Sequence, residues 1–254
     1  MKLSVCGKGG SGKSTVVSLL SNAALSRGLK TLVVDSDESN SGLFKMLGFR
    51  EPPVPLIELV GGKQSLKEKM GQANIFTEAE IQVENIPPLY MCKKDGLMLV
   101  SIGKILQALE GCACPMGVLS REFLNKLRLA ENEIAIVDME AGVEHFGRGL
   151  DAGIDGVVLV VEPSHESIVT SAKIRDLARE MQKNVWAVLN KIHSESLGAR
   201  LKAELENGQI ETIGVIPYDP EIFTACLEGN PIGQGQGMRQ AEEILAKLLA
   251  KNTT

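Results

Sequence analysis

Short apolar runs alternate with amphipathic stretches along most of the chain. The apolar runs are continuous rather than alternating, which is typical of parallel strands buried on both faces of a sheet. They predict strands at Leu3–Cys6, Thr31–Asp35, Leu97–Ile102, Ile134–Asp138, Val157–Val161, Val185–Asn190 and Ile213–Val215. Helical spacing of apolar residues predicts helices at Ser14–Arg27, Ser120–Ala130, His165–Met181, Glu195–Glu206 and Arg239–Ala250. This order indicates an α/β fold, with one doubly wound, mostly parallel sheet and helices on both faces.

The stretch at about residues 48–96 breaks this alternation. It contains Pro52-Pro53-Val54-Pro55, Gly61-Gly62 and Pro87-Pro88, with scattered charges and weak periodicity. We expect an irregular inserted region with short helices, on the ligand-facing side of a single domain that spans residues 1–254. Two interpretations of this region remain open. It is either an ordered insertion on the surface or a segment that folds only around a partner or in a dimer.

Composition and charge narrow the class of protein. The chain has 254 residues, which is near the upper limit for a single domain with one hydrophobic core. Of these residues 44% are hydrophobic and 23% charged, values typical of a soluble globular protein. Its formal net charge of −5 argues against sequence-independent binding to nucleic acid. No apolar run approaches the ~18 residues of a membrane span, and the chain begins directly with its first strand. With five cysteines, we expect a cytoplasmic protein in a reducing compartment.

The first predicted strand leads into a phosphate-binding loop. Residues Gly7–Thr15 read Gly-Lys-Gly-Gly-Ser-Gly-Lys-Ser-Thr, which completes the pattern Gly-x-x-x-x-Gly-Lys-[Ser/Thr]. A strand before the motif and a helix after it are the context that the motif requires. The backbone N–H groups of such a loop point inward and form an anion site at a positive helix end. The sequence therefore predicts a P-loop NTPase that binds ATP and ADP with Mg²⁺.

Each position of the loop has an expected role. Lys13 is expected to lie along the β- and γ-phosphates, and the Ser14 hydroxyl to ligate Mg²⁺. The expected nucleotide contacts are Gly9, Gly10, Ser11, Gly12, Lys13, Ser14 and Thr15. Lys8 is an additional lysine, placed before the helix, where its side chain is able to reach beyond its own phosphates.

Acidic residues follow two of the predicted strands, at the edge where ligands bind in open α/β sheets. Asp138 ends one strand and is expected near Mg²⁺, while Gly142 is suited to donate its N–H to the γ-phosphate. Asp37 is the candidate for positioning the attacking water, and Asp35 for supporting the Mg²⁺ shell. The alternative is that both of these acids cap the turn that follows their strand.

Two further positions are candidates for the base. Asn190 ends another strand and is placed to read the adenine edge, and Pro217-Tyr218 follows the last strand, where it would flank the ring. These assignments rest on position alone.

Together, these motifs resemble the deviant Walker A ATPases. The resemblance rests on Lys8–Ser14, Asp35-x-Asp37 and Asp138-x-x-x-Gly142, and it covers nearly the whole chain. The group includes MinD, ParA, the arsenite and tail-anchored-protein ATPases and the nitrogenase iron protein. It implies Mg²⁺-dependent ATP hydrolysis in ATP-induced homodimers, with Lys8 reaching the partner's nucleotide as an arginine finger does. The residues alone fit a solvent-exposed loop lysine equally well.

A Cys-x-Cys pair suggests what a dimer would hold. The segment reads Gly111-Cys112-Ala113-Cys114-Pro115, and two thiolates at this spacing can face one Zn²⁺ or Ni²⁺ ion. Two such pairs across a dimer would supply four ligands. Two small buried residues are the alternative, although the Gly and Pro flanks favour an exposed loop. His145 is the nearest auxiliary ligand, Cys92 is ambiguous, and Cys6 and Cys226 are expected to be buried.

The surrounding residues resemble one subgroup in particular. Gly-Cys-Ala at 111–113 is similar to the cluster-ligand segment of the nitrogenase iron protein, but residues 141–146 lack its second cysteine. The Cys-x-Cys pair with Asp-Met-Glu-Ala-Gly-Val-Glu-His at 138–145 is similar to the CooC-type accessory proteins of carbon monoxide dehydrogenase maturation. That resemblance implies an ATPase that assists nickel insertion into the Ni–Fe–S cluster of carbon monoxide dehydrogenase, its recipient. A MinD/ParA-like positioning ATPase and an iron-protein-like electron-transfer ATPase are the alternatives.

Overall fold

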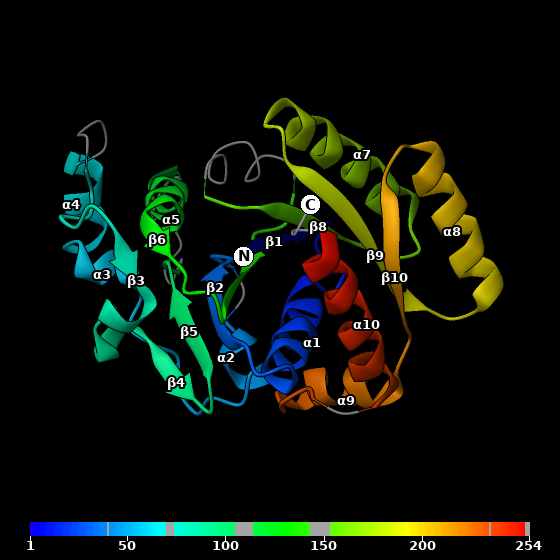
Figure 1. The fold of residues 1–254 in the computed structure, drawn as a ribbon, viewed down its shortest axis with the longest axis horizontal. Coiled ribbons are helices and arrows are strands. Elements are labelled where there is room, and N and C mark those ends of the chain that lie inside the picture. Colours follow the sequence, from blue (N-terminus) through cyan, green and yellow to red (C-terminus); the bar gives the residue numbers. More distant parts are fainter. Residues whose placement is uncertain (40, 70–73, 105–113, 143–152, 234, 252–254) are drawn as a thin grey trace.

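The structure, a computed structural model, describes all residues except 40, 70–73, 105–113, 143–152, 234 and 252–254. Within this described part, a central sheet contains eight strands in the order β10-β9-β8-β1-β7-β2-β5-β4 (Figure 1). The strands are β1 (Lys2–Gly7), β2 (Lys30–Ser36), β4 (Cys92–Lys94), β5 (Leu97–Ser101), β7 (Glu133–Met139), β8 (Gly156–Val161), β9 (Asn184–Ile192) and β10 (Glu211–Pro217). All neighbours pair in parallel except β4 and β5. The predicted fold class is confirmed.

The strands form where they do because their side chains enter a core on both faces of the sheet. All six residues of β8 are buried. Val158 and Val160 belong to one apolar cluster, and Val157, Leu159 and Val161 belong to the other. Successive side chains of a strand point to opposite faces, so a strand covered on both sides reads as a continuous apolar run.

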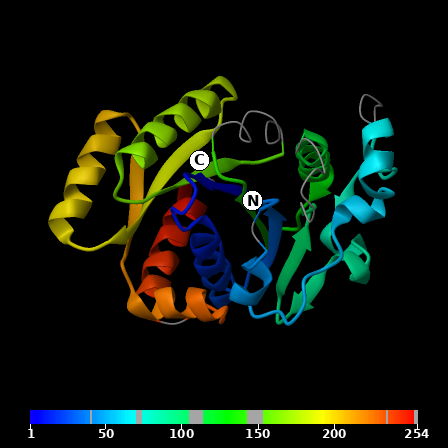
Figure 2. The ribbon, with the colours of Figure 1, turned by 180° about the vertical axis from the view of Figure 1, so that it is seen from behind.

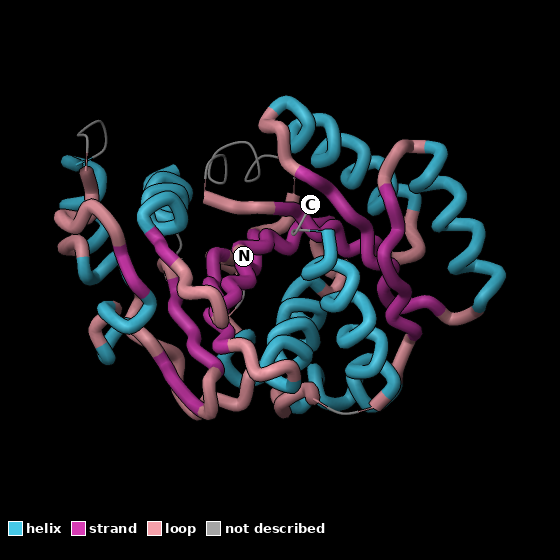
Figure 3. Tube along the Cα trace, in the orientation of Figure 1, coloured by secondary structure: helices cyan, strands magenta, loops and turns pink. Residues whose placement is uncertain are grey.

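Helices cover the two faces of the sheet (Figure 3). One face carries α1 (Lys13–Ser26) and α10 (Gln236–Lys251), with α2 (Leu43–Met46) and α9 (Pro220–Glu228) near their ends. The other face carries α5 (Cys114–Lys126), α7 (His165–Glu180) and α8 (Glu195–Asn207). The apolar side chains of α10 pack inward, since Ile244, Leu245 and Leu248 are buried. Among the described residues, no helix is long and apolar enough to cross a membrane.

The region at about residues 48–96 packs against α5 (Figure 2). Its elements are α3 (Leu56–Leu59), α4 (Gly62–Lys69), β3 (Ile81–Gln82), the 3-10 turns η1 (Val83–Asn85) and η2 (Pro88–Tyr90), and β4. Strand β3 pairs in parallel with β6 (Leu127–Arg128), which directly follows α5. The Glu122 carboxylate on α5 accepts hydrogen bonds from the N–H groups of Ile75 (2.7 Å) and Phe76 (3.0 Å). The inserted region is thereby anchored to the helix that begins at Cys114.

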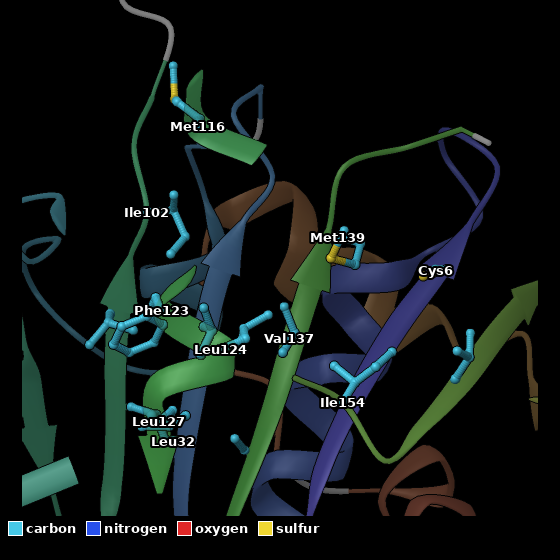
Figure 4. Packing of buried hydrophobic residues seen from close by; sticks show 14 of the residues in the cluster. Cys6, Leu32, Ile102, Met116, Phe123, Leu124, Leu127, Val137, Met139 and Ile154 are labelled. Atoms are coloured by element: carbon cyan, nitrogen blue, oxygen red, sulfur yellow. The ribbon is translucent and has the colours of Figure 1, made fainter. Parts of the chain in front are cut away.

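Helix α5 also seals the apolar space between this region and the sheet. Leu124 lies beside Val137 of β7, Phe123 lies toward β5, and Met116 lies on the side of Ile102, which directly follows β5 (Figure 4). The chain passes very close to the helix at Gly153, where a Cβ would lie 2.6 Å from the carbonyl carbon of Leu124.

Both ends of one predicted helix need correction. Helix α5 begins at Cys114, six residues before the predicted Ser120 and not in an exposed loop. Pro115 is its second residue, where a missing N–H group removes no helical hydrogen bond. The helix ends at Lys126 because Leu127 and Arg128 pair with β3, so the predicted end at Ala130 is wrong.

Helix α9 was not predicted, although its ends carry local signals. The Asp219 carboxylate accepts from the N–H of Glu221, Pro220 is the first helical residue, and Gly229 ends the helix in the left-handed region. The helix spans only nine residues, and a segment this short gives a weak periodic signal in the sequence.

The chain has one tryptophan, Trp186 on β9. It is 5% exposed, and its indole ring lies directly over Gly156 of β8, where a Cβ would collide with the ring. Gly156 therefore provides the space that this ring fills.

Candidate functional site

A pocket of about 620 Å³ lies at the carboxyl edge of the sheet, as the fold requires. The P-loop forms one side, and the ends of β9 and β10 with helix α9 form the other. Its lining residues are Gly10, Gly12, Lys13, Ser14, Thr15, Asp37, Met46, Asn190, Lys191, His193, Ile216, Pro217, Tyr218, Asp219, Ile222, Phe223 and Cys226.

The P-loop holds its shape through glycine conformations and one buried amide. Gly12 has φ 93°, which is left-handed, and a Cβ on it would collide with the side-chain nitrogen of Asn190. That Asn190 nitrogen donates to the carbonyl oxygen of Ser11 at 2.9 Å. Of the two base candidates, Asn190 therefore supports the loop with one end of its amide while it also lines the pocket.

Three polar side chains meet beneath the loop. Lys13 is buried, and the Ser14 hydroxyl donates to Asp138 Oδ2 at 2.6 Å. Asp138 has no exposed surface, and burial raises its pKa to about 7. Its Oδ1 has no hydrogen-bond partner among the described residues.

Asp35 lies beside Asp138 in the register of β2 and β7. Burial raises the pKa of Asp35 to about 6, although Lys104 opposes the rise with its ammonium group 2.7 Å from Oδ2. Asp35 Oδ1 also has no hydrogen-bond partner in the described structure. Unsatisfied carboxylate oxygens next to a serine hydroxyl form the hard-oxygen donor set that Mg²⁺ prefers, so these residues fit that ion.

Asp37 caps the turn that follows β2, as the alternative interpretation of the two acids predicted. It also lines the pocket. Its Oδ1 accepts from the N–H (2.9 Å) and the hydroxyl (2.6 Å) of Ser39, which caps the turn after β2. Asp35 forms an ion pair with Lys104 and also accepts a hydrogen bond from the backbone N–H of Asp37. Next to Asp37, the buried Glu38 has its pKa raised to about 7, first by burial and then by the charge of Glu140.

Lys8 points away from its own phosphate pocket and pairs with acids after β8. Its ammonium group lies 2.8 Å from Glu162 Oε1 and 3.8 Å from Glu166 Oε2. The other Glu162 oxygen lies 3.3 Å from Lys191, whose ammonium group also donates to the carbonyl of Gly10. Burial raises the pKa of Glu162, but the hydrogen bonds from both lysines outweigh it and hold the pKa below its usual value.

Gly142 lies next to the P-loop and forms a hydrogen bond with it. Its φ is 106°, a left-handed value that favours glycine. Its N–H donates to the carbonyl oxygen of Gly7 at 3.4 Å. The group predicted to contact the γ-phosphate is therefore bonded within the chain in this structure.

The base side of the pocket carries aromatic rings. The His193 and Tyr218 rings stack with centroids 4.6 Å apart, next to Pro217. Phe223 of α9 lies 6.5 Å from Tyr218, and it is 56% exposed. Stacked, half-exposed rings of this kind offer a flat apolar surface to a purine.

Sequence reasoning missed several of these residues. They are Lys104, Glu162, Lys191, His193 and Phe223, and none of them carries a motif. Lys104, Glu162 and His193 follow strands and Lys191 is the second-last residue of β9, so position at a strand end is the signal that could have found these four.

The cysteine predictions have different outcomes. Cys6 is buried as predicted, and burial raises its pKa to about 12. The prediction that Cys226 is buried is wrong: it is exposed on α9, with its sulfur 3.7 Å from the Thr15 hydroxyl. Cys92 is half-buried and donates to the carbonyl of Glu51.

The Cys-x-Cys pair is only partly covered by the structure. Cys112 and His145 lie outside the described residues, and Cys114 is the first residue of α5. Within the described ranges, no group of three or more His, Cys, Asp or Glu side chains is placed to hold a metal ion.

Comparison with known proteins places this site in a family. The model of the CobQ/CobB/MinD/ParA nucleotide-binding domain matches residues 3–232. An uncharacterized ATP-binding protein of Methanocaldococcus jannaschii is 40% identical over 253 residues, which cover 97% of this chain and 100% of the relative. The carbon monoxide dehydrogenase accessory protein CooC of Rhodospirillum rubrum is 32% identical over 235 residues, with 90% and 88% covered.

Solved structures show the same fold. The cell division ATPase MinD of Pyrococcus furiosus superposes with a TM-score of 0.71 at 22% identity, over 98% of both chains. The family model covers the P-loop, the aspartates at the carboxyl ends of β2 and β7 and the pocket residues at the ends of β9 and β10. The chain therefore belongs to the CobQ/CobB/MinD/ParA nucleotide-binding family and is an ATPase of the MinD/ParA type.

Proposed function

We propose that this protein is a cytoplasmic, metallochaperone-type ATPase that assists nickel insertion into carbon monoxide dehydrogenase. The observation that carries the proposal is its 32% identity to a carbon monoxide dehydrogenase accessory protein over 90% of the chain. In this proposal ATP joins two copies, and their Cys112 and Cys114 thiolates hold one Ni²⁺ or Zn²⁺ ion between them.

The nucleotide chemistry is assigned to residues at the carboxyl edge of the sheet. The backbone of Gly9–Ser14 cradles the phosphates, and Lys13 offsets their charge. Bound Mg²⁺ would neutralise charge on the phosphate oxygens, and Ser14, with Asp138 beside it, is placed to hold it. Asp37 lines the same pocket and is assigned to position the attacking water.

Adenine recognition is assigned to Asn190 and Pro217. Because the Asn190 nitrogen is committed to Ser11, its side-chain oxygen remains to accept from the amino group of adenine. Pro217 and the stacked Tyr218 would lie against the ring.

Binding of ATP would break two contacts in this arrangement. The N–H of Gly142 must leave the Gly7 carbonyl to reach a γ-phosphate. The Lys8 ammonium group must leave Glu162 to reach the nucleotide of a second copy. Both changes depend on the third phosphate or on the partner, so ADP alone would leave the resting contacts in place.

The metal would be cargo rather than a resident cofactor. Each subunit offers only the two thiolates of its Cys-x-Cys pair, which is half of a tetrahedral site. Helix α5 begins at Cys114 and is held at its far end by the inserted region. A recipient that contacts the inserted region would therefore act on the helix that carries one ligand.

Metal stoichiometry tests the proposal. The native protein is expected to bind about one Ni²⁺ or Zn²⁺ ion per dimer, measured by equilibrium dialysis with elemental analysis. The double variant Cys112→Ala/Cys114→Ala should lose this binding, and the matched control Cys92→Ala/Cys226→Ala should keep it. Equal binding by the native protein and the Cys112/Cys114 variant would refute the proposal.

The fold likeness to MinD keeps a positioning ATPase as the second candidate. That function predicts ATP-dependent binding to liposomes or DNA. The apolar residues of α10 are packed on the sheet rather than presented on a surface, which disfavours membrane binding through this helix. Co-sedimentation with anionic liposomes distinguishes the two candidates, and visible absorbance of anaerobically prepared protein would instead favour the iron-protein-like alternative.

A further inference from the structure

Lys104 is a nearly buried lysine to which the ATPase motifs give no role. It lies just after β5, and its side chain is 15% exposed. Its ammonium group is 2.7 Å from Asp35 Oδ2 and also donates to the main-chain carbonyl of Asp37. The Lys104 ammonium group thus binds both the Asp35 side chain at the end of β2 and the backbone of the turn that follows.

Burying the Lys104–Asp35 ion pair costs free energy of folding, which suggests that the pair has a functional role. An ion pair this buried loses much of its hydration, and replacement by apolar side chains is often neutral or stabilising. The pair also lies in a crowded acidic site, because the sheet register sets Asp35 beside Asp138 and Ser101. Lys104 reaches into that site from the strand on the other side of β2.

We propose that Lys104 is a positioning residue of the ATPase site, which fixes Asp35 and Asp37 for Mg²⁺-dependent hydrolysis. The inference rests on the roles proposed above for these two acids. By engaging Asp35 Oδ2, Lys104 leaves only Oδ1, which has no partner in the described part, to face a cation or its water. By engaging the carbonyl of Asp37, it fixes the turn in which the Asp37 carboxylate is held by Ser39.

Removal of this ammonium group should therefore affect turnover more than binding. The proposed nucleotide contacts lie on the P-loop and at the ends of β9 and β10, and Lys104 itself does not line the pocket. Freed from its partner, the Asp35 carboxylate would add uncompensated negative charge beside Mg²⁺, so less Mg²⁺ would saturate the site. The turn that carries Asp37 would lose its anchor, and small misplacements of a catalytic group cost roughly 100-fold in rate.

The test compares Lys104→Met and Lys104→Arg with Lys126→Met. Lys126 is a matched control, since it is 13% exposed and paired with Glu122 at 3.1 Å, but lies at the far end of α5. We expect Lys104→Met to lower kcat roughly 10- to 100-fold with little change in the KM for ATP. The half-saturating Mg²⁺ concentration should fall, and Lys104→Arg should recover most of kcat. Lys126→Met should change none of these.

A second readout needs neither nucleotide nor metal. Amide hydrogen exchange of the free protein should be faster at Ser39 in Lys104→Met, because its N–H bonds to Asp37 within the anchored turn. Lys126→Met should leave that exchange rate unchanged. If Lys104→Met folds poorly, Asp35→Asn/Lys104→Met removes the pair without leaving an unpaired charge, and its kcat should still be low.

Two outcomes would overturn the inference. One is a kcat for Lys104→Met equal to that of Lys126→Met, and the other is unchanged exchange at Ser39. Asp37→Asn, assayed alongside, separates this result from the proposed function. Normal turnover in Asp37→Asn refutes the role given to Asp37, whereas slow Asp37→Asn with normal Lys104→Met refutes Lys104 alone. None of these assays depends on nickel or on the recipient.

Discussion

Asp138 shows how a single residue balances stability against function. Its carboxyl group is fully buried under the P-loop and has one hydrogen-bond donor, Ser14, with Oδ1 unsatisfied among the described residues. Burial raises its pKa to about 7 because the charged form is poorly solvated there. Bound Mg²⁺ or its water would supply a partner for this oxygen, so a charged Asp138 costs free energy of folding that ligand binding would offset.

This cost predicts a pH dependence of stability. Because the folded-state pKa of Asp138 is above the ordinary value of 3.8, the folded protein binds more protons than the unfolded chain between these values. The stabilising contribution is therefore fully present below about pH 4 and is lost as the pH rises to about 7. Asp138→Asn should be more stable than the native protein at pH 8, by an amount on the order of 4 kcal/mol if the whole pKa shift is recovered.

Urea unfolding at several pH values tests this prediction. The difference in the free energy of unfolding between Asp138→Asn and the native protein should shrink toward pH 5, where the native carboxyl is already protonated. The Asp138→Asn variant should also lose ATPase activity. A variant that is less stable than the native protein at pH 8 would show that the buried charge is compensated by groups other than Ser14.

The residues of the site differ in how far the sequence predicts them. Lys13 and Ser14 are predictable because the P-loop is a local motif whose strand and helix follow one another in the chain. Lys104 and Glu162 are not, because sheet pairing brings each of them to a partner distant in sequence. A lone lysine or glutamate has no local pattern that marks a buried ion pair.

At the scale of elements, the parallel strands of the central sheet were predictable, whereas the limits of α5 and the short strands β3, β4 and β6 were not. A continuous apolar run is enough to indicate a parallel strand that is covered on both faces. The limits of α5 depend instead on contacts with residues distant in sequence, since β3 takes Leu127 and Arg128 out of the predicted helix. The inserted region that supplies β3 has weak periodicity, so this pairing leaves no trace in the local pattern.

The close approach of Gly153 to α5 yields a prediction at this scale. Gly153→Ala should destabilise the protein by about 1–3 kcal/mol, because its Cβ would lie 2.6–2.9 Å from helix atoms that include backbone. Gly117→Ala, within the same helix and with open space at its Cβ, should be neutral or stabilise by up to ~1 kcal/mol. Thermal unfolding measures both. Equal stability of the two variants would mean that α5 moves freely to accommodate a methyl group.

At the scale of the whole molecule, the proposed function requires that ATP joins two copies. Lys8 is held within its own chain by Glu162, and the same acid binds Lys191. A lysine that works across an interface must exchange this partner for the phosphates of the second subunit. Glu162 would therefore oppose assembly until ATP is bound.

The assembly prediction concerns three variants of this contact. Lys8→Ala should bind ATP but fail to dimerise, because the group that reaches the second nucleotide is missing. Glu162→Gln should dimerise at lower concentrations of a non-hydrolysable ATP analogue than the native protein, because Lys8 is released. Glu166→Gln is the control, since Glu166 is 3.8 Å from Lys8 and 75% exposed, and it should behave as the native protein.

Analytical ultracentrifugation across a range of analogue concentrations measures these differences. Normal dimerisation of Lys8→Ala would refute a role for Lys8 across the interface. An unchanged concentration dependence in Glu162→Gln would show that the internal contact does not restrain assembly.

The position of Trp186 gives the molecule a built-in optical probe. As the sole tryptophan, packed over Gly156 on the strand β8 next to β1, it senses the integrity of the sheet interior. Tyr218, one of two tyrosines, lies instead at the nucleotide pocket. Selective excitation of the indole should therefore follow global unfolding without any label, and should remain nearly silent when a nucleotide or a second copy binds.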